Sequence, residues 1–308
     1  MTQEHRIRGV LAPVVTPFNR DLCPDPARLI AHCRWLLTQN CGLAVFGTNS
    51  EANSLSVDER MALLDALLAA GVDASRMMPG TGCCALSDSV RLTAHAVRAG
   101  CAGVLMLPPF YYKGVSEDGL YRSFAEVIER VGDARLRLYL YHIPPIAMVG
   151  ITPSLVERLL KQYPTTVAGM KDSSGDWKNT KMMLDTFAGS GFDVFAGSES
   201  FLLANMQNGG VGCISATANV NPEAIAQLCR DWRGADAEVQ QQALNAVRRT
   251  VEQFVMIPAL KTIVAHYSGD AAWLTVRPPL TGLTAAQAQQ LLDRLRALTF
   301  DMPGLRAS

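Results

Sequence analysis

One pattern repeats eight times along this chain of 308 residues. A short apolar run ends in glycine, proline or polar residues, and an amphipathic stretch then follows. The eight apolar runs are Gly9–Phe18, Gly42–Glu51, Met77–Cys83, Gly103–Phe110, Leu136–Pro144, Thr166–Ser174, Phe192–Ser200 and Gly210–Val220. Strand-like runs that alternate with helical patterns are typical of a parallel sheet. Because eight such units close within about 220 residues, the sequence favours a (β/α)8 TIM barrel, an α/β fold.

A doubly wound α/β sheet is the alternative fold. It would need a glycine-rich phosphate fingerprint, G-x-G-x-x-G, after an early strand. The sequence has no such motif. The segments Gly80–Gly82 and Gly209–Gly212 match it only in part and are more typical of tight turns.

Helix start signals separate the apolar runs. Ser56-x-x-Glu59 matches a capping box, and Thr152-Pro153 places a capping residue before a first-turn proline. The other predicted N-caps are Asp25, Ser87, Ser116 and Asp176.

The chain after residue 221 is helical in pattern throughout. Asn221-Pro222 predicts a helix start, and a long apolar-periodic stretch from about Ala237 to Tyr267 is interrupted by Pro258, which should kink or split it. Thr284-x-x-Gln287 predicts a capping box before a final helix that ends near Leu298. We therefore expect a catalytic barrel over residues 1–221 and an appended layer of about three helices over residues 222–308.

Composition narrows the class of protein. Hydrophobic residues make up 49% of the chain and charged residues 18%, which is typical of a globular protein with a large core. The 28 basic and 28 acidic residues cancel, and no basic stripe is present, so nucleic acid is not expected as a partner. The stretch Met61–Val72 is interrupted by Asp65 and is too short to span a bilayer.

Further residue counts address location and metals. The eight cysteines are scattered without a C-x-x-C pair, and the N-terminus has no apolar signal-peptide core, so we expect a cytoplasmic protein with reduced thiols. The five histidines lack metal-binding spacing. Neither a metal nor a cofactor is predicted.

Lys171 is the strongest candidate for a reactive side chain. It ends the apolar run that begins at Thr166, and a turn follows at once. The chain has six lysines against 22 arginines, so lysine is rarely used for surface charge. Burial at the tip of a strand disfavours an ammonium group, and a neutral amine can attack a ketone to form a Schiff base. The alternative is a structural lysine whose ammonium group reaches solvent.

Barrel active sites lie at the carboxyl ends of the strands. Such ends would place Thr48 and Asn49, Tyr112, and Tyr141 around the end that carries Lys171. A tyrosine hydroxyl can relay protons, and hydroxyl, amide and backbone N–H groups can hold a carboxylate. Each tyrosine alone could equally be a packing residue; their joint placement favours a site.

Three motifs at these strand ends occur in a recognisable order. They are Gly47-Thr48-Asn49-Ser50-Glu51, Tyr141-x-x-Pro144 and Gly169-x-Lys171-Asp172. With Gly9–Phe18 at one end and Arg277–Leu280 at the other, nearly the whole chain resembles the dihydrodipicolinate synthase / N-acetylneuraminate lyase family of class I lyases.

The resemblance implies a role for each matching residue. Lys171 would form a Schiff base with a 2-oxo acid, usually pyruvate, and Tyr141 would relay protons. Thr48 would link Tyr141 to Tyr112, which would serve the site of a neighbouring subunit. The substrate-binding residues would be Gly47, Asn49, Ser50, Ile214, Gly197, Glu199 and Ser200. The resemblance also implies a homotetramer, built as a dimer of dimers.

Two departures from the family pattern bear on the substrate. Ser50 replaces a glycine and would be strained if φ were positive there. The lysine-biosynthesis members carry an arginine after the Tyr-x-x-Pro motif, whereas this chain has Ile146, Ala147 and Met148. Such apolar residues offer no bidentate contact to a second carboxylate. Asn49, in place of the commoner threonine, resembles the 4-hydroxy-2-oxoglutarate aldolase branch.

We therefore predict reversible aldol cleavage that releases pyruvate, from 4-hydroxy-2-oxoglutarate or a 2-keto-3-deoxy sugar acid. Glu199 and Ser200 are also compatible with a substrate that carries several hydroxyl groups. The alternatives are 4-hydroxy-tetrahydrodipicolinate synthase, a sugar-acid dehydratase and a non-catalytic oxo-acid sensor. A metal-dependent aldolase would need clustered histidines and carboxylates, and only His142 and Glu51 stand near the predicted strand ends.

Overall fold

The computed structural model describes residues 6–305 and divides the chain into two compact units. The first unit contains the described residues up to Gly9 together with Asp73–Ile214, and the second contains Val10–Val72 and the described residues from Ser215 onward. Across the described residues, no helix is both long and apolar enough to cross a membrane.

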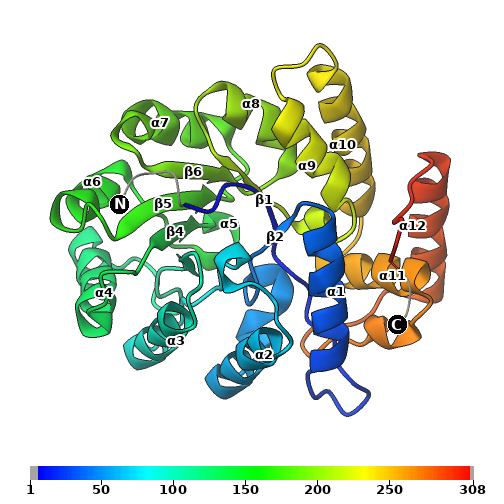
Figure 1. Cartoon of the computed structure of the whole chain (residues 1–308), viewed down its shortest axis with the longest axis horizontal. Helices are drawn as coiled ribbons and strands as arrows, with labels where there is room; N and C mark the ends of the chain where they lie inside the picture. The colour runs from blue at the N-terminus through cyan, green and yellow to red at the C-terminus, as the bar shows by residue number, and fades with distance from the viewer. Residues whose placement is uncertain (1–5, 306–308) are drawn as a thin grey trace. The chain divides into compact units, whose positions relative to one another are not determined.

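The first unit is built on five parallel strands, which pair in chain order: β3 (Val104–Met106), β4 (Leu138–His142), β5 (Val167–Asp172), β6 (Asp193–Ala196) and β7 (Gly212–Ile214). Every residue in these strands is buried. Strands that are buried on both faces need cover on their outer side. That cover comes from α3 (Leu86–Arg98), α4 (Glu117–Val131), α6 (Pro153–Gln162), α7 (Trp177–Phe187) and α8 (Leu202–Gln207), and Figure 1 shows α4, α6, α7 and α8 outside β4, β5 and β6.

The apolar run Met77–Cys83 differs from its prediction. In place of a strand it forms an isolated bridge between Gly80 and Leu105. The Leu105 N–H donates to Pro79 O, and Thr81 N–H donates to Leu105 O. Pro79 has no N–H with which to extend the ladder. Over the described residues, the other seven predicted runs each contain a strand, although each strand is shorter than its run.

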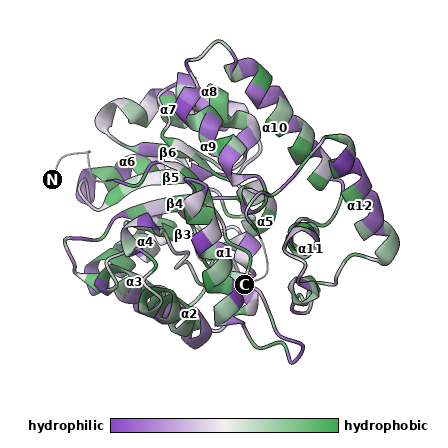
Figure 2. Ribbon diagram, turned by 45° about the vertical axis from the view of Figure 1, so that its right-hand side comes forward, coloured by the Kyte–Doolittle hydropathy of each residue, from purple (hydrophilic) through white to green (hydrophobic). Residues whose placement is uncertain are grey.

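The second unit contains most of β1 (Gly9–Ala12), which pairs in parallel with β2 (Gly42–Leu43). Helices α1 (Pro26–Thr38) and α2 (Val57–Ala69) pack on each other. The later helices are α9 (Pro222–Asp231), α10 (Ala237–Val251), α11 (Met256–Ser268) and α12 (Ala285–Ala297), and α10 contacts the other three. Figure 2 shows mixed hydrophilic and hydrophobic residues along α10 and α12, as expected for helices with one buried face.

Most predicted helix starts are confirmed. The side chains of Asp25, Ser56, Ser116, Thr152, Asp176 and Thr284 each accept a backbone N–H in the first turn of a helix. The prediction for Ser87 was wrong, because this residue lies inside α3, where Ala85 is the N-cap. Ser89, in the first turn of α3, instead binds the preceding loop, because its Oγ accepts the N–H of Cys83 at 2.9 Å.

The predicted break in the long C-terminal stretch is confirmed, but Pro258 does not mark its position. The chain leaves the helical conformation between α10 and α11, and Pro258 lies in the first turn of α11. A proline is tolerated in a first turn because the N–H it lacks would have no intrahelical partner.

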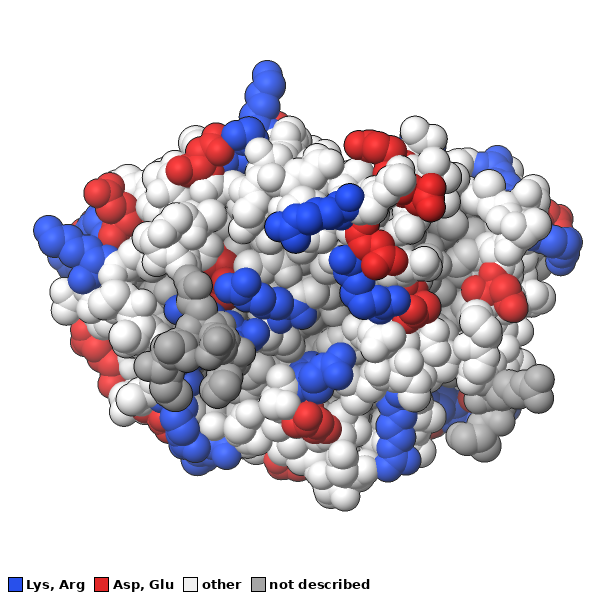
Figure 3. All heavy atoms as spheres, turned by 45° about the horizontal axis from the view of Figure 1, so that its top comes forward, with Lys and Arg blue, Asp and Glu red and all other residues white. Residues whose placement is uncertain are grey.

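The surface mixes both signs of charge: on the face drawn in Figure 3, Lys and Arg side chains lie among Asp and Glu side chains.

Candidate active site

Lys171 lies near the end of β5, and 2% of it is exposed. Its register partner on β4 is Tyr141, which is also buried. Residues in register on paired strands project to the same side of a sheet. The Lys171 amine therefore donates a hydrogen bond to the Tyr141 hydroxyl at 3.2 Å, and its Nζ lies 4.3 Å from the centroid of the Tyr141 ring. The two strands thus place a nucleophile beside a group that can carry protons.

The next residue on each strand supports this pair from the other face. The Asp172 carboxylate accepts hydrogen bonds from Ser174 N, Asn179 Nδ2 and Thr180 Oγ1 at 2.7 to 2.9 Å, so it fixes the turn into α7. His142 Nδ1 accepts the N–H of Ile151 at 2.9 Å. Burial lowers the pKa of His142, while the Asp172 carboxylate opposes that shift. Both side chains serve to hold the strand ends in place.

The glycine of the Gly-x-Lys-Asp motif has a packing reason. A Cβ on Gly169 would lie 2.2 Å from Asp193 O and 2.9 Å from the Tyr139 ring. The Tyr139 hydroxyl donates to Asp193 Oδ2 at 3.2 Å, and Arg6 pairs with the same carboxylate at 3.4 Å. Any larger residue at Gly169 would push β5 away from this network and displace Lys171.

The loop after β6 lies against the loop after β5. A Cβ on Gly197 would lie 2.1 Å from Ser173 Oγ and 2.6 Å from Asp172 O, so only glycine allows this approach. Glu199 is buried, and Ser200 donates its N–H to Ser198 Oγ at 3.2 Å. The structure therefore brings Gly197 close to the strand end that carries Lys171, and the binding roles of Gly197, Glu199 and Ser200 stay predictions.

The other predicted residues of the first unit differ in exposure. Ile214 ends β7 and is fully buried. Tyr112 is 73% exposed and packs edge-to-face on Tyr111, with 5.3 Å between the ring centroids. Its predicted role at a neighbouring subunit's site stays a prediction.

The motif Gly47–Glu51 belongs to the second unit. Thr48–Ser50 form a 3₁₀ turn, η2, and the buried Ser50 accepts the Gly47 N–H through its Oγ at 3.2 Å. Ser50 does not have a positive φ; the left-handed residue is Glu51, with φ 55°. The strain considered for serine is therefore absent. The binding roles of Gly47, Thr48 and Asn49 stay predictions.

Sequence reasoning missed Lys261, which pairs with Glu51. A signal was present, because Lys261 is a lone charge in the apolar segment from Ala259 to Ala265. Within residues 6–305, no three His, Cys, Asp or Glu side chains are grouped so as to hold a metal ion.

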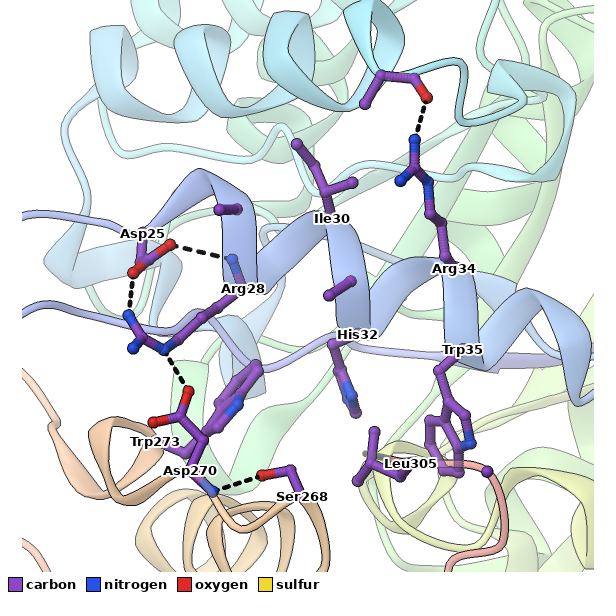
Figure 4. A pocket seen from close by; sticks show the side chains of 14 residues that line it. Asp25, Arg28, Ile30, His32, Arg34, Trp35, Ser268, Asp270, Trp273 and Leu305 are labelled. Carbon is purple, nitrogen blue, oxygen red and sulfur yellow. Dashed lines mark hydrogen bonds and ion pairs between the residues drawn. The ribbon is translucent and has the colours of Figure 1, made fainter. Parts of the chain in front are cut away.

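A cavity of about 720 Å³ lies along α1 in the second unit. In Figure 4, Arg28 lies between Asp25 and Asp270, with 2.5 Å from its Nε to Asp270 Oδ2. His32 stacks on Trp35 and meets the edge of Trp273. Arg34 donates to Ala70 O at 2.6 Å, so both arginines at this cavity already have partners, and we assign the cavity no part in catalysis.

His32 should nevertheless affect stability at acid pH. It is buried, and among the described residues neither ring nitrogen has a hydrogen-bond partner. Burial lowers its pKa to about 4. The unfolded chain takes up the proton near pH 6.5 and the folded chain only near pH 4. Stability that is complete above pH 6.5 is therefore lost as the pH falls toward 4.

We expect this single group to remove roughly 2–3 kcal/mol of stability between pH 7.5 and 4.5, at about 1.4 kcal/mol per pKa unit. This pH-dependent loss of stability should disappear in His32→Phe. It should remain in His266→Phe, because His266 is exposed. Urea unfolding at the two pH values measures the difference. Equal losses in the wild type and His32→Phe would contradict the assignment.

Comparison with known proteins gives the family. The model of the Dihydrodipicolinate synthetase family matches residues 6–298. A 4-hydroxy-tetrahydrodipicolinate synthase of Thermus thermophilus is 35% identical, with 94% of this chain and 95% of that protein covered. The crystal structure of dihydrodipicolinate synthase from Agrobacterium tumefaciens C58 is 32% identical, has a TM-score of 0.88, and covers 95% of this chain and 99% of its own.

A second solved structure contains a small molecule. YagE, a prophage protein of the dihydrodipicolinic acid synthase family from E. coli K12, was crystallised in complex with pyruvate. It is 27% identical to this chain, with a TM-score of 0.88 and coverage of 96% of this chain and 99% of its own.

Proposed function

Because this chain belongs to the dihydrodipicolinate synthetase family, we propose that it is a lyase in which Lys171 forms a Schiff base with a 2-oxo acid. The observation that carries the proposal is the buried contact of 3.2 Å between Lys171 Nζ and Tyr141 Oη. An amine in such a site has a hydroxyl within reach for every proton transfer that imine formation requires.

The proposed reaction begins with attack of the Lys171 nitrogen on the oxo carbon. One proton of the amine passes to the resulting alkoxide and Tyr141 delivers a second, so the oxygen leaves as water, a protonated C=N bond forms to the lysine, and Tyr141 is left as the phenolate. In aldol cleavage the bond between C3 and C4 of the substrate then breaks. Its electron pair moves toward the imine nitrogen, and Tyr141 accepts the proton of the C4 hydroxyl as an aldehyde departs. Protonation at C3 and hydrolysis release pyruvate and the free amine.

Tyr141→Phe separates proton relay from imine formation. Its kcat should fall by about 10² to 10⁴, the usual contribution of a positioned acid or base. Borohydride should still trap pyruvate on Lys171, though more slowly, because the amine remains. Steady-state rates and intact-mass spectrometry measure the two effects. An unchanged kcat would show that another group relays the protons.

The wall after the Tyr-x-x-Pro motif favours pyruvate release over the synthase reaction. Helix α5 (Pro144–Ala147) carries Ile146, 63% exposed, and Met148 follows it, 70% exposed. Lys113 approaches the same segment, but its ammonium group donates to the carbonyls of Phe110 and Ala147. This segment thus offers apolar side chains where a second carboxylate would need a guanidinium fork. The complex of YagE with pyruvate supports a 2-oxo acid as the ligand of this chain, whichever of the two reactions it carries out.

Substrate assays distinguish the candidates. We expect pyruvate to appear from 4-hydroxy-2-oxoglutarate or 2-keto-3-deoxygluconate, measured with lactate dehydrogenase and NADH. Condensation of pyruvate with aspartate 4-semialdehyde would instead identify 4-hydroxy-tetrahydrodipicolinate synthase, the function named for the Thermus thermophilus relative. Loss of the sugar acid without pyruvate release would identify a dehydratase. Binding of an oxo acid without reductive trapping or turnover would identify an oxo-acid sensor.

The family resemblance extends the proposal to the rest of the chain. We propose that Thr48, Asn49 and the backbone at Gly47 bind the substrate carboxylate, and that Thr48 links Tyr141 to Tyr112.

We also propose a closed (β/α)8 barrel over residues 1–221, appended helices over 222–308, and a cytoplasmic homotetramer. The exposed aromatic rings of Tyr111 and Tyr112 support burial against a second copy. Analytical ultracentrifugation tests the assembly.

A further inference from the structure

A fully buried ion pair fixes the residue that follows the Thr48–Ser50 turn. The side chains of Glu51 and Lys261 are both 0% exposed, and the Lys261 ammonium group donates to Glu51 Oε1. The other carboxylate oxygen, Oε2, accepts the backbone N–H of Arg277 at 3.0 Å. Lys261 also donates to Thr275 O at 2.9 Å. Both oxygens of Glu51 are therefore held by groups more than 200 residues away in the chain.

A second layer holds these partners in turn. The Arg277 guanidinium group donates to both carboxylate oxygens of Glu59, at 2.5 and 2.9 Å, and to Ser54 O at 2.6 Å. The Phe18 ring lies beneath both cations, 4.5 Å from Lys261 Nζ and 4.7 Å from Arg277 Cζ. The donors that reach Glu51 are consequently fixed by charge, hydrogen bonds and ring contact together.

The backbone of Glu51 needs such support. Its φ of 55° and ψ of 33° are left-handed, and it lies between η2 (Thr48–Ser50) and the next 3₁₀ turn, η3 (Ala52–Ser54). A residue with a Cβ is disfavoured in this conformation and keeps it only where its surroundings impose it. If Glu51 relaxed, the bond of 3.2 Å from Ala52 N to Gly47 O would open, because it closes the turn across the φ and ψ of Glu51.

Stability alone gives a poor account of the pair. Burial of two opposite charges carries a desolvation cost that their attraction often fails to exceed, and an apolar pair of similar volume is commonly as stable. Burial lowers the pKa of Lys261 to about 8 despite the adjacent carboxylate, which reflects that cost. An apolar side chain in place of Glu51 could not accept hydrogen bonds from Lys261 and from the Arg277 N–H, and these two bonds anchor Glu51.

We infer that Glu51 and Lys261 are positioning residues that lock the left-handed turn after Ser50, so that Thr48, Asn49 and their backbone N–H groups stay arranged for a substrate carboxylate. This inference rests on the proposed function. Neither residue touches the substrate in this account. Their effect is on affinity for the carboxylate and not on the Schiff-base step at Lys171.

The test compares Glu51→Gln with wild type in borohydride trapping at increasing concentrations of two probes, pyruvate and its methyl ester. Glutamine keeps the size of the side chain but removes the charge that attracts Lys261. We expect the pyruvate concentration for half-maximal trapping to rise by about tenfold to a hundredfold, since an ionic hydrogen bond is worth a few kcal/mol. Half-maximal trapping of methyl pyruvate, which lacks a carboxylate, should change less than twofold.

Two further proteins make the result specific. Asp293→Asn breaks an exposed ion pair with Arg296 on α12, outside this network, and should trap pyruvate like the wild type. The double variant Glu51→Gln/Lys261→Met removes both charges of this pair, so it should fold even if single variants do not, and it should retain the weak pyruvate response. Circular dichroism at the assay temperature confirms folding in each case.

The outcomes separate the two proposals. If wild-type protein is not trapped by pyruvate or a 2-keto-3-deoxy acid, the proposed function fails. If wild type is trapped and folded Glu51→Gln has an unchanged pyruvate response, only the positioning inference is overturned. An equal loss for pyruvate and its methyl ester would also overturn it, because a general weakening of the fold does not distinguish a carboxylate from an ester.

Discussion

Lys171→Ala should abolish reductive trapping and activity together. Borohydride delivers hydride to the carbon of the C=N bond and converts the Schiff base to a secondary amine, so the wild type should gain the mass of one reduced pyruvate. The alanine variant has no amine at this position and should gain none. Its kcat should fall by at least about 10⁴, the scale seen when a covalent nucleophile is removed.

The matched controls address charge and nonspecific trapping. Lys171→Arg keeps a cation at the buried position but cannot form the imine, so it should be as inactive as alanine. Lys178→Ala removes a lysine that lies in the first turn of α7 and should be trapped like the wild type. Peptide mapping locates the adduct. Trapping that persists in Lys171→Ala would place the Schiff base on another lysine and end the proposal.

Lys261→Met should be strongly destabilising. It leaves the Glu51 carboxylate buried without its cation, and breaking a buried pair in this way typically costs about 3–5 kcal/mol. In Glu51→Gln/Lys261→Met neither charge of the pair remains, so most of that loss should be recovered. Urea unfolding at pH 7 gives the free energies, and the interaction energy follows from the double-mutant cycle.

An exposed ion pair provides the comparison. Lys181 pairs with Asp185 on the surface of α7, at 2.6 Å and with 43% and 58% of the side chains exposed. Lys181→Met should cost less than about 1 kcal/mol, as is usual for solvated pairs. Similar costs for Lys261→Met and Lys181→Met would mean that Glu51 and Lys261 do not form a charged pair in solution.

Features that depend on local pattern could be predicted from the amino-acid sequence alone. The alternation of apolar runs and amphipathic stretches indicated parallel strands between helices, since side-chain period and turn residues are encoded over a few positions. Capping residues such as Ser56 and Thr284 marked helix starts for the same reason. Lys171 could be singled out because a lysine that ends an apolar run is visible without any tertiary contact. The ordered motifs gave the family, which the match over residues 6–298 confirms.

Only the tertiary structure decided which distant side chains meet. The hydrogen bond from Lys171 to Tyr141 depends on the register between β4 and β5, which cannot be read from the sequence. Glu51 and Lys261 are 210 positions apart, so their pairing is a property of packing. The run Met77–Cys83 looked like a strand, yet Pro79 limits it to a bridge. Local pattern reports what each segment favours, whereas burial, register and the meeting of remote charges arise once the segments pack together.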